Sequence, residues 1–84
     1  MHGITDLGGG TCAMLYNDKV IAQLNSDKSI LLHSQGDRSE QTRKRINTFA
    51  NYMDLPYKLY ADWVLVYRGV EIPFTDGIKL EEKK

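Results

Sequence analysis

The chain has 84 residues, with 11 basic and 11 acidic side chains and a formal net charge of zero. A chain of this length forms one domain with a single core and has little room for a deep catalytic cleft. Zero net charge means that any electrostatic attraction of a partner must come from a local patch. The single cysteine, Cys12, excludes an internal disulfide and is typical of a reducing compartment. No apolar run approaches the ~20 residues of a membrane helix, so we expect a soluble, cytoplasmic protein.

The first part of the chain is predicted to be a glycine-rich leader followed by a meander of strands. Residues 1–10 contain four of the seven glycines and few apolar side chains, which predicts a flexible leader. From residue 11 onward short apolar runs alternate with turn residues. The predicted strands are residues 11–16, 20–24 and 29–33. Three strands this close in sequence form an antiparallel meander.

A helix is predicted from Asp37 to Met53. Asp37 is a suitable N-cap, and Glu40 three positions later completes the spacing of a capping box. Pro56 stops the helix, because proline cannot continue it and disfavours helical backbone at the residue before it. The residues at helical spacing that we expect to pack on the sheet are Thr42, Ile46, Phe49, Ala50 and Met53.

After the helix, β-branched and aromatic residues predict a return to strands. The expected strands are residues 57–60, 63–67 and 70–74, and a short last strand at 78–80 is left open. Pro73 places the 70–74 strand at a sheet edge, because proline has no N–H for a further ladder. We therefore predict an α+β fold of order β-β-β-α-β-β, with a small, mainly antiparallel sheet and one amphipathic helix on one face. The domain spans residues 11–80, and 81–84 form a charged tail.

The start of the predicted helix is unusually basic. Four cations lie close together there: Arg38, Arg43, Lys44 and Arg45. Cations near the positive end of a helix dipole are unfavourable, and bound negative charge would offset that cost. With the hydroxyls of Ser39 and Thr42, this helix start predicts an anion-binding site.

A polar stripe is predicted beside the core-facing side of the helix. Its members are Arg38, Gln41, Arg45, Thr48 and Tyr52. Such side chains can contact phosphates and stack on a base. The alternative is an ordinary solvated flank, with Tyr52 at the rim of the core and the arginine stems over apolar surface.

Aromatic side chains are frequent after the helix and suggest an interface. In alternation, residues 57–67 present largely apolar side chains to both faces. Either the sheet is covered on both sides, or one face contacts a partner or a second copy in a homo-oligomer. For the second case we predict Tyr60, Trp63 and Tyr67 as the anchoring residues.

Two motifs suggest chemistry that we do not expect. Residues 6–11 match the phosphate-binding loop of the actin and heat-shock ATPases, but 84 residues cannot supply the two large domains that enclose the nucleotide there. His33, Ser34 and Asp37 are neighbours in sequence, which does not produce the geometry of a catalytic triad. The histidines and Cys12 show no metal-ligand spacing. We therefore predict no enzyme activity, no cofactor and no metal site.

Several short matches to a family pattern run from Tyr16 to Phe49. They are Tyr16-Asn17, Ile21-Ala22, Leu31-Leu32, Ser39, Thr42, Lys44 and Phe49, with Arg45 where the family has histidine. In these residues the chain resembles a family of uncharacterised small proteins of bacteriophages, plasmids and their hosts. The resemblance implies a small accessory protein of a mobile element, a class that includes inhibitors of host defence.

Two functional hypotheses follow. The first is a non-enzymatic binding or inhibitor protein whose partner is a protein or an anionic ligand. In this hypothesis the protein is encoded by a phage or another mobile element and acts in counter-defence, like an anti-CRISPR or by sequestering a signal. The second is a small nucleic-acid-binding regulator that uses Arg38, Lys44, Arg45 and Tyr52. Zero net charge favours the first, because nucleic-acid-binding domains usually carry a clear excess of basic residues.

Overall fold

The computed structural model describes residues 3–81, and within them it contains one helix and eight strands. The helix is α1 (Glu40–Met53). The strands are β1 (Gly3–Gly8), β2 (Thr11–Tyr16), β3 (Lys19–Leu24), β4 (Ile30–Leu32), β5 (Tyr57–Leu59), β6 (Val64–Tyr67), β7 (Val70–Pro73) and β8 (Ile78–Leu80). Every strand pairing is antiparallel. The predicted α+β class and the short last strand are confirmed, while residues 82–84 of the predicted tail lie outside the described residues.

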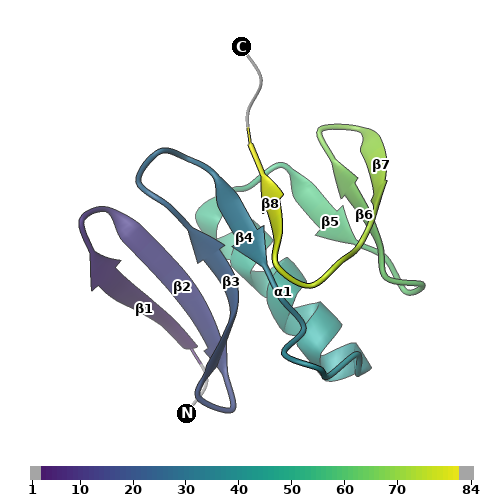
Figure 1. The fold of residues 1–84 in the computed structure, drawn as a ribbon, viewed down its shortest axis with the longest axis horizontal. Coiled ribbons are helices and arrows are strands. Elements are labelled where there is room, and N and C mark those ends of the chain that lie inside the picture. The colour runs from purple at the N-terminus through teal and green to yellow at the C-terminus, as the bar shows by residue number, and fades with distance from the viewer. Residues whose placement is uncertain (1–2, 82–84) are drawn as a thin grey trace.

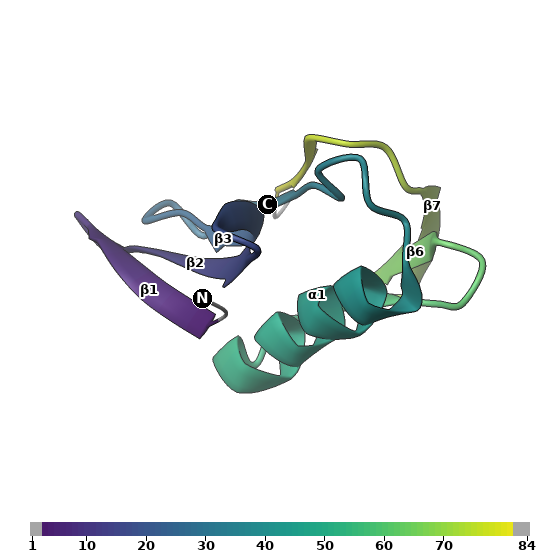
Figure 2. The same ribbon diagram turned by 90° about the horizontal axis from the view of Figure 1, so that it is seen from below.

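The strands form two sheets instead of the single sheet predicted. Five strands have the order β1-β2-β3-β4-β8, and three have the order β5-β6-β7 (Figure 1). The division arises because β8 returns to pair with β4, which leaves β7 as an edge of its own sheet. Pro73 ends β7 and has no N–H to offer to another strand, in agreement with the predicted edge position. The helix lies along one side of the molecule, against both sheets (Figure 2).

The predicted flexible leader is wrong for residues 3–8, which form β1. This strand pairs with β2, placing Gly3 opposite Leu15. Gly9 and Gly10 lie between the two strands with φ of 61° and 83°, a conformation that glycine adopts without steric cost. Two of the four glycines that suggested a flexible leader thus form a hairpin turn, and Gly3 and Gly8 are the end residues of β1. Because β1 belongs to the larger sheet, the predicted domain boundary at residue 11 is also wrong.

The helix begins three residues later than predicted, and its N-cap is Ser39. The Ser39 hydroxyl accepts a hydrogen bond of 3.3 Å from the Thr42 N–H. Asp37 instead accepts a bond of 2.9 Å from the Ser39 N–H, and this bond lowers the pKa of the Asp37 carboxyl. The predicted capping box at Asp37 is therefore wrong. At the other end, Asp54 adopts a left-handed conformation and its N–H bonds the carbonyl of Ala50, which closes the helix.

The core lies between α1 and the inner faces of both sheets. Four of the five residues predicted to face the core are buried, namely Thr42, Ile46, Phe49 and Ala50, and the fifth, Met53, is partly buried. The Tyr57 hydroxyl donates a hydrogen bond of 2.7 Å to the Ile46 carbonyl, so this buried polar atom has a partner. Burial raises the pKa of the Tyr57 phenol well above its ordinary value.

The aromatic segment after the helix forms a hairpin in which Tyr67 faces the core. Tyr57 pairs with Tyr67 across β5 and β6, and paired residues of antiparallel strands lie on the same face. Tyr67 is only 9% exposed. The prediction that Tyr67 anchors an interface is therefore wrong. Trp63 is partly buried in the turn of this hairpin, and Tyr60 is exposed.

Candidate anion-binding site

The basic residues of the predicted anion cluster point to three different places. Arg38 contacts Trp63 in the β5–β6 turn, and Arg43 contacts β5. Lys44 and Arg45 lie near the end of β2. The two hydroxyl residues of the predicted site have other positions in the fold. Ser39 caps the helix, and Thr42 is fully buried. The structure therefore does not bring the predicted anion-binding residues together at the helix start.

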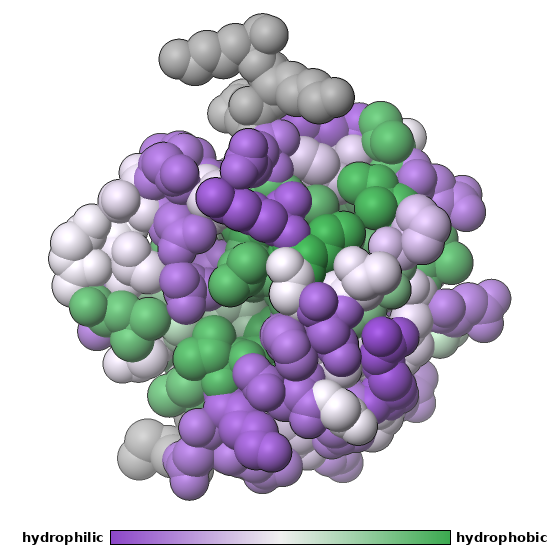
Figure 3. Space-filling model, in the orientation of Figure 1, coloured by the Kyte–Doolittle hydropathy of each residue, from purple (hydrophilic) through white to green (hydrophobic). Residues whose placement is uncertain are grey.

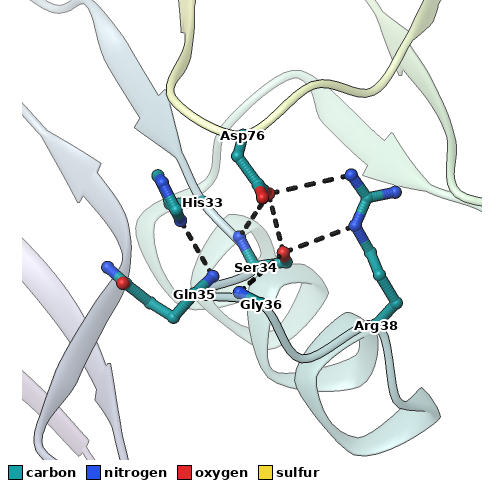
Figure 4. Close-up of polar contacts among 6 residues, drawn as sticks. All are labelled: His33, Ser34, Gln35, Gly36, Arg38 and Asp76. Atoms are coloured by element: carbon teal, nitrogen blue, oxygen red, sulfur yellow. Dashed lines mark hydrogen bonds and ion pairs between the residues drawn. The ribbon is translucent and has the colours of Figure 1, made fainter.

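Arg38 joins a polar cluster that connects loops distant in sequence. Its Nε donates a hydrogen bond of 3.3 Å to Ser34 Oγ, and its terminal nitrogen lies 3.8 Å from Asp76 Oδ1 (Figure 4). The guanidinium also lies over the rings of Trp63 and Phe74. These contacts tie the loop before α1 to the loop between β7 and β8 and to the β5–β6 turn. Arg38 therefore has a structural role in linking these three loops.

In the same cluster, Ser34 and His33 each have a hydrogen-bond partner other than Asp37. The Ser34 hydroxyl donates directly to Asp76 Oδ1 at 2.6 Å, and the Ser34 N–H donates to the same oxygen at 3.0 Å (Figure 4). The hydroxyl bond is the main reason that the pKa of Asp76 is lowered. His33 Nδ1 accepts a hydrogen bond of 2.8 Å from the Gln35 N–H. Because Ser34 is buried and its hydroxyl bonds the carboxylate, it is not placed to act as a nucleophile.

Arg43 attaches the helix to the smaller sheet. Its guanidinium donates to the Leu59 carbonyl at 3.2 Å and to the Glu40 carboxylate at 3.0 Å, and its side chain is 15% exposed. Asn47, one turn further on, exchanges two hydrogen bonds with the Leu59 backbone, at 2.8 and 2.7 Å. Arg43 therefore stabilises the contact between α1 and β5 and is not available to a ligand.

The remaining two cations line a pocket between α1 and the end of β2. The pocket has a volume of about 470 Å³, and we call it the Tyr16 pocket; its lining residues are Tyr16, Gln41, Lys44, Arg45 and Thr48. The Arg45 guanidinium lies 5.0 Å from the centre of the Tyr16 ring, a cation–π contact. The Tyr16 hydroxyl donates a hydrogen bond of 2.6 Å to Gln41 Oε1. Tyr16 thus positions two side chains of the helix.

The Tyr16 pocket presents mainly hydrogen-bond donors. Because Gln41 Oε1 accepts from Tyr16, the end of the amide that remains for a ligand is the NH₂ group. The Thr48 hydroxyl donates to the Lys44 carbonyl at 2.9 Å and is therefore directed to the helix backbone. Within residues 3–81, neither Lys44 nor Arg45 forms an ion pair. An amide NH₂, an ammonium and a guanidinium together fit an oxyanion.

Tyr52 continues this side of the helix beyond the pocket. Gln41, Arg45, Thr48 and Tyr52 recur at i, i+4, i+7 and i+11, which places them on one stripe of α1. The predicted stripe is thus present without Arg38, which precedes the helix. Sequence reasoning missed Tyr16, because it reaches the helix only through the packing of β2 on α1. Many strands end in an aromatic residue, so this feature of the sequence could not identify Tyr16 as part of the site.

The uncovered sheet face is that of the larger sheet. Alternation along β2 and β4 places Leu15 and Leu31 on the side away from α1, because their neighbours Met14 and Leu32 are in the core. Both leucines are partly exposed, and apolar side chains are visible across this face (Figure 3). The expected apolar face therefore does not consist of Tyr60, Trp63 and Tyr67. The homo-oligomer stays a prediction.

Comparison of the chain with protein-family models, with curated proteins and with solved structures found no match. The resemblance to small phage and plasmid proteins therefore stays a prediction. In the part of the chain that the structure describes, no helix has the length and apolar character needed to cross a bilayer. Across the same residues, no group of three or more histidine, cysteine or acidic side chains is arranged to hold a metal ion. The geometry of the Tyr16 pocket is the main guide to function.

Proposed function

We propose that this protein is a non-enzymatic binding protein that recognises an anionic partner through the Tyr16 pocket. The proposal rests on one observation: Lys44 and Arg45 are adjacent in the pocket, and neither forms an ion pair with another described residue. The Arg45 guanidinium is also held in place by the Tyr16 ring. A positioned cation loses less conformational entropy when it binds than a free one does.

The electrostatics of the pocket favour a partner that docks closely. The chain has zero formal charge, so Lys44 and Arg45 create a local positive patch in a molecule without a net charge. Charges on such a surface are screened over about 8–10 Å at near-physiological ionic strength. The partner must therefore bring its negative group into the pocket, and binding must weaken as salt is raised.

An inhibitor of host defence is the narrower form of this proposal. A protein that binds the anionic signal of a host-defence system needs a cationic pocket and no catalytic group. The resemblance to proteins of mobile elements supports this role. The second candidate, a nucleic-acid-binding protein, is favoured by one specific observation, the exposed Tyr52 on the same stripe as Arg45.

The test is a charge reversal in the pocket with a matched control outside it. In the variant Lys44→Glu with Arg45→Glu, binding to labelled polyglutamate and to labelled inorganic polyphosphate should be lost in fluorescence anisotropy at low salt. The control variant Lys58→Glu with Lys79→Glu makes the same change of net charge at exposed residues of β5 and β8 and should bind both probes as the wild type does. Circular dichroism checks that both variants are folded. Equal binding by the wild type and the pocket variant would overturn the proposal.

A further inference from the structure

We infer that the anionic ligand of the Tyr16 pocket is single-stranded nucleic acid, with backbone phosphates at Lys44 and Arg45 and an unpaired base stacked on Tyr52. The inference rests on the proposed function and names its ligand class. The main evidence is the Tyr52 side chain, which is 73% exposed and lies on the same helix stripe as Arg45.

Tyr52 has no cation over its ring, unlike the other aromatic side chains of residues 3–81 that are at least partly exposed, which are Tyr16, Tyr60 and Trp63. The aromatic–cation pairs of the structure are Tyr16 with Arg45, Trp63 and Phe74 with Arg38, Tyr60 with Lys58, and Tyr67 with Arg68. Tyr57, in contrast, is buried in the core. Within the described part of the chain, Tyr52 makes no ring contact and no side-chain hydrogen bond. Its ring is therefore accessible for stacking.

The separation of Tyr52 from the pocket suits a nucleotide. Arg45 and Tyr52 are seven residues apart, which is two helical turns or about 10 Å along the axis. This span is comparable to the reach from a backbone phosphate to the base of a neighbouring nucleotide. Thr48 lies between them with its hydroxyl bonded to the Lys44 carbonyl, so no charged side chain interrupts the stripe.

The combination of charge and an exposed ring favours nucleic acid over an acidic peptide. Carboxylates can bind Lys44 and Arg45 but offer no aromatic face to Tyr52. A base does offer one, and stacking on aromatic side chains tolerates any base sequence. The strand must be single, because the base faces of a duplex are already stacked on each other. Because the net charge is zero, the affinity comes from only a few phosphate contacts. We therefore expect weak binding that is best measured at low salt.

The experiment compares Tyr52→Ala and Tyr52→Phe in binding to labelled oligothymidylate and to inorganic polyphosphate. Loss of a stacked base weakens oligonucleotide binding about fivefold to 150-fold, so Tyr52→Ala should lower that affinity by this factor. Tyr52→Phe should retain it, and neither variant should change polyphosphate binding. The matched control is Tyr60→Ala, which removes an exposed aromatic residue outside the stripe and should bind both probes normally. A substitution at the solvent-exposed Tyr52 leaves the core intact, which thermal unfolding verifies.

The salt dependence gives a second, independent readout. Two phosphate contacts to a single strand predict a slope of about −1.4 in log affinity against log salt, or about a sevenfold loss from 50 to 200 mM. Lys44→Ala and Arg45→Ala should each reduce the slope by about 0.7, whereas Tyr52→Ala should leave it unchanged.

The outcomes separate this inference from the proposed function. If polyphosphate and polyglutamate bind through Lys44 and Arg45 but Tyr52→Ala has no effect on oligothymidylate, the nucleic-acid inference is wrong and the proposed function stands. Preference for a duplex over the single strand would also overturn the inference. If none of the three probes binds the wild type at low salt, both proposals are wrong.

Discussion

The guanidinium of Arg38 lies 5.0 Å from the centre of the Trp63 ring, although the two residues are 25 positions apart. Arg38 also lies 4.9 Å from the centre of the Phe74 ring, and the Trp63 and Phe74 rings pack edge to face with their centres 5.1 Å apart. Trp63 adopts a left-handed backbone with φ of 57°, which is unfavourable for a side chain of this size. Contacts of Trp63 with Arg38 and Phe74 help to stabilise that turn.

Replacement of Arg38 should therefore destabilise the fold. Arg38→Ala removes two cation–π contacts and the hydrogen bond to Ser34, and we expect a loss of about 1–2 kcal/mol in the free energy of unfolding. Lys44→Ala, the control at an exposed cation of the same segment, should leave the free energy unchanged within about 0.5 kcal/mol. Urea unfolding followed by Trp63 fluorescence measures both, and equal midpoints for the two variants would contradict the structural role of Arg38.

The helix N-cap should be sensitive to substitution at Ser39. Ser39→Ala leaves the Thr42 N–H without its side-chain acceptor and should cost about 0.5–2 kcal/mol, whereas Ser39→Asp should retain most of the stability. Asp37→Ala, which removes only the acceptor in the preceding turn, should cost less than Ser39→Ala. Chemical denaturation ranks the three variants. A larger effect at Asp37 would mean that the helix begins there, as the sequence suggested.

Tyr57 should make the protein sensitive to alkaline pH. The pKa of the buried phenol is raised above the ordinary value of 10.0 by burial, so the unfolded chain loses this proton at a lower pH than the folded protein does. The stability that the Tyr57 phenol contributes is fully present below pH 10 and decreases as the pH rises above 10. Tyr57→Phe should remove that part of the decline and cost about 0.5–1.5 kcal/mol at neutral pH through loss of the bond to Ile46. Thermal unfolding from pH 7 to 11 checks this; identical pH profiles would count against it.

Asp76 should contribute to acid sensitivity. Its pKa is lowered below the ordinary value of 3.8, first by the Ser34 hydroxyl, so the folded carboxylate holds its proton less tightly than the unfolded one. The stability that the Asp76 carboxylate provides is fully present above pH 3.8 and is lost as the pH falls through the lowered pKa of the folded protein. Asp76→Asn should therefore be less stable than the wild type at pH 7, with a smaller further loss in acid. Glu71→Gln, on exposed β7, is the control for net charge and should follow the wild type.

Local periodicity in the sequence was sufficient to predict the helix face and most strands. Ile46, Phe49 and Ala50 recur at helical spacing, and burying such a stripe is favourable in almost any tertiary context, so the core face could be read from the chain. The edge position of Pro73 followed in the same way from a missing N–H. The α+β class needed only the order of these elements.

Only the tertiary structure decided which polar side chains act together. Arg38, Arg43 and Arg45 are close in sequence, but each contacts a different part of the fold, because a helix directs successive side chains about 100° apart and Arg38 precedes it. Tyr16 and Gln41 are 25 positions apart and meet through the packing of a strand on the helix. Such pairs depend on long-range contacts that local sequence does not encode. For that reason the sequence could predict a positive helix, and only the fold could show which two of its cations remain accessible to a ligand.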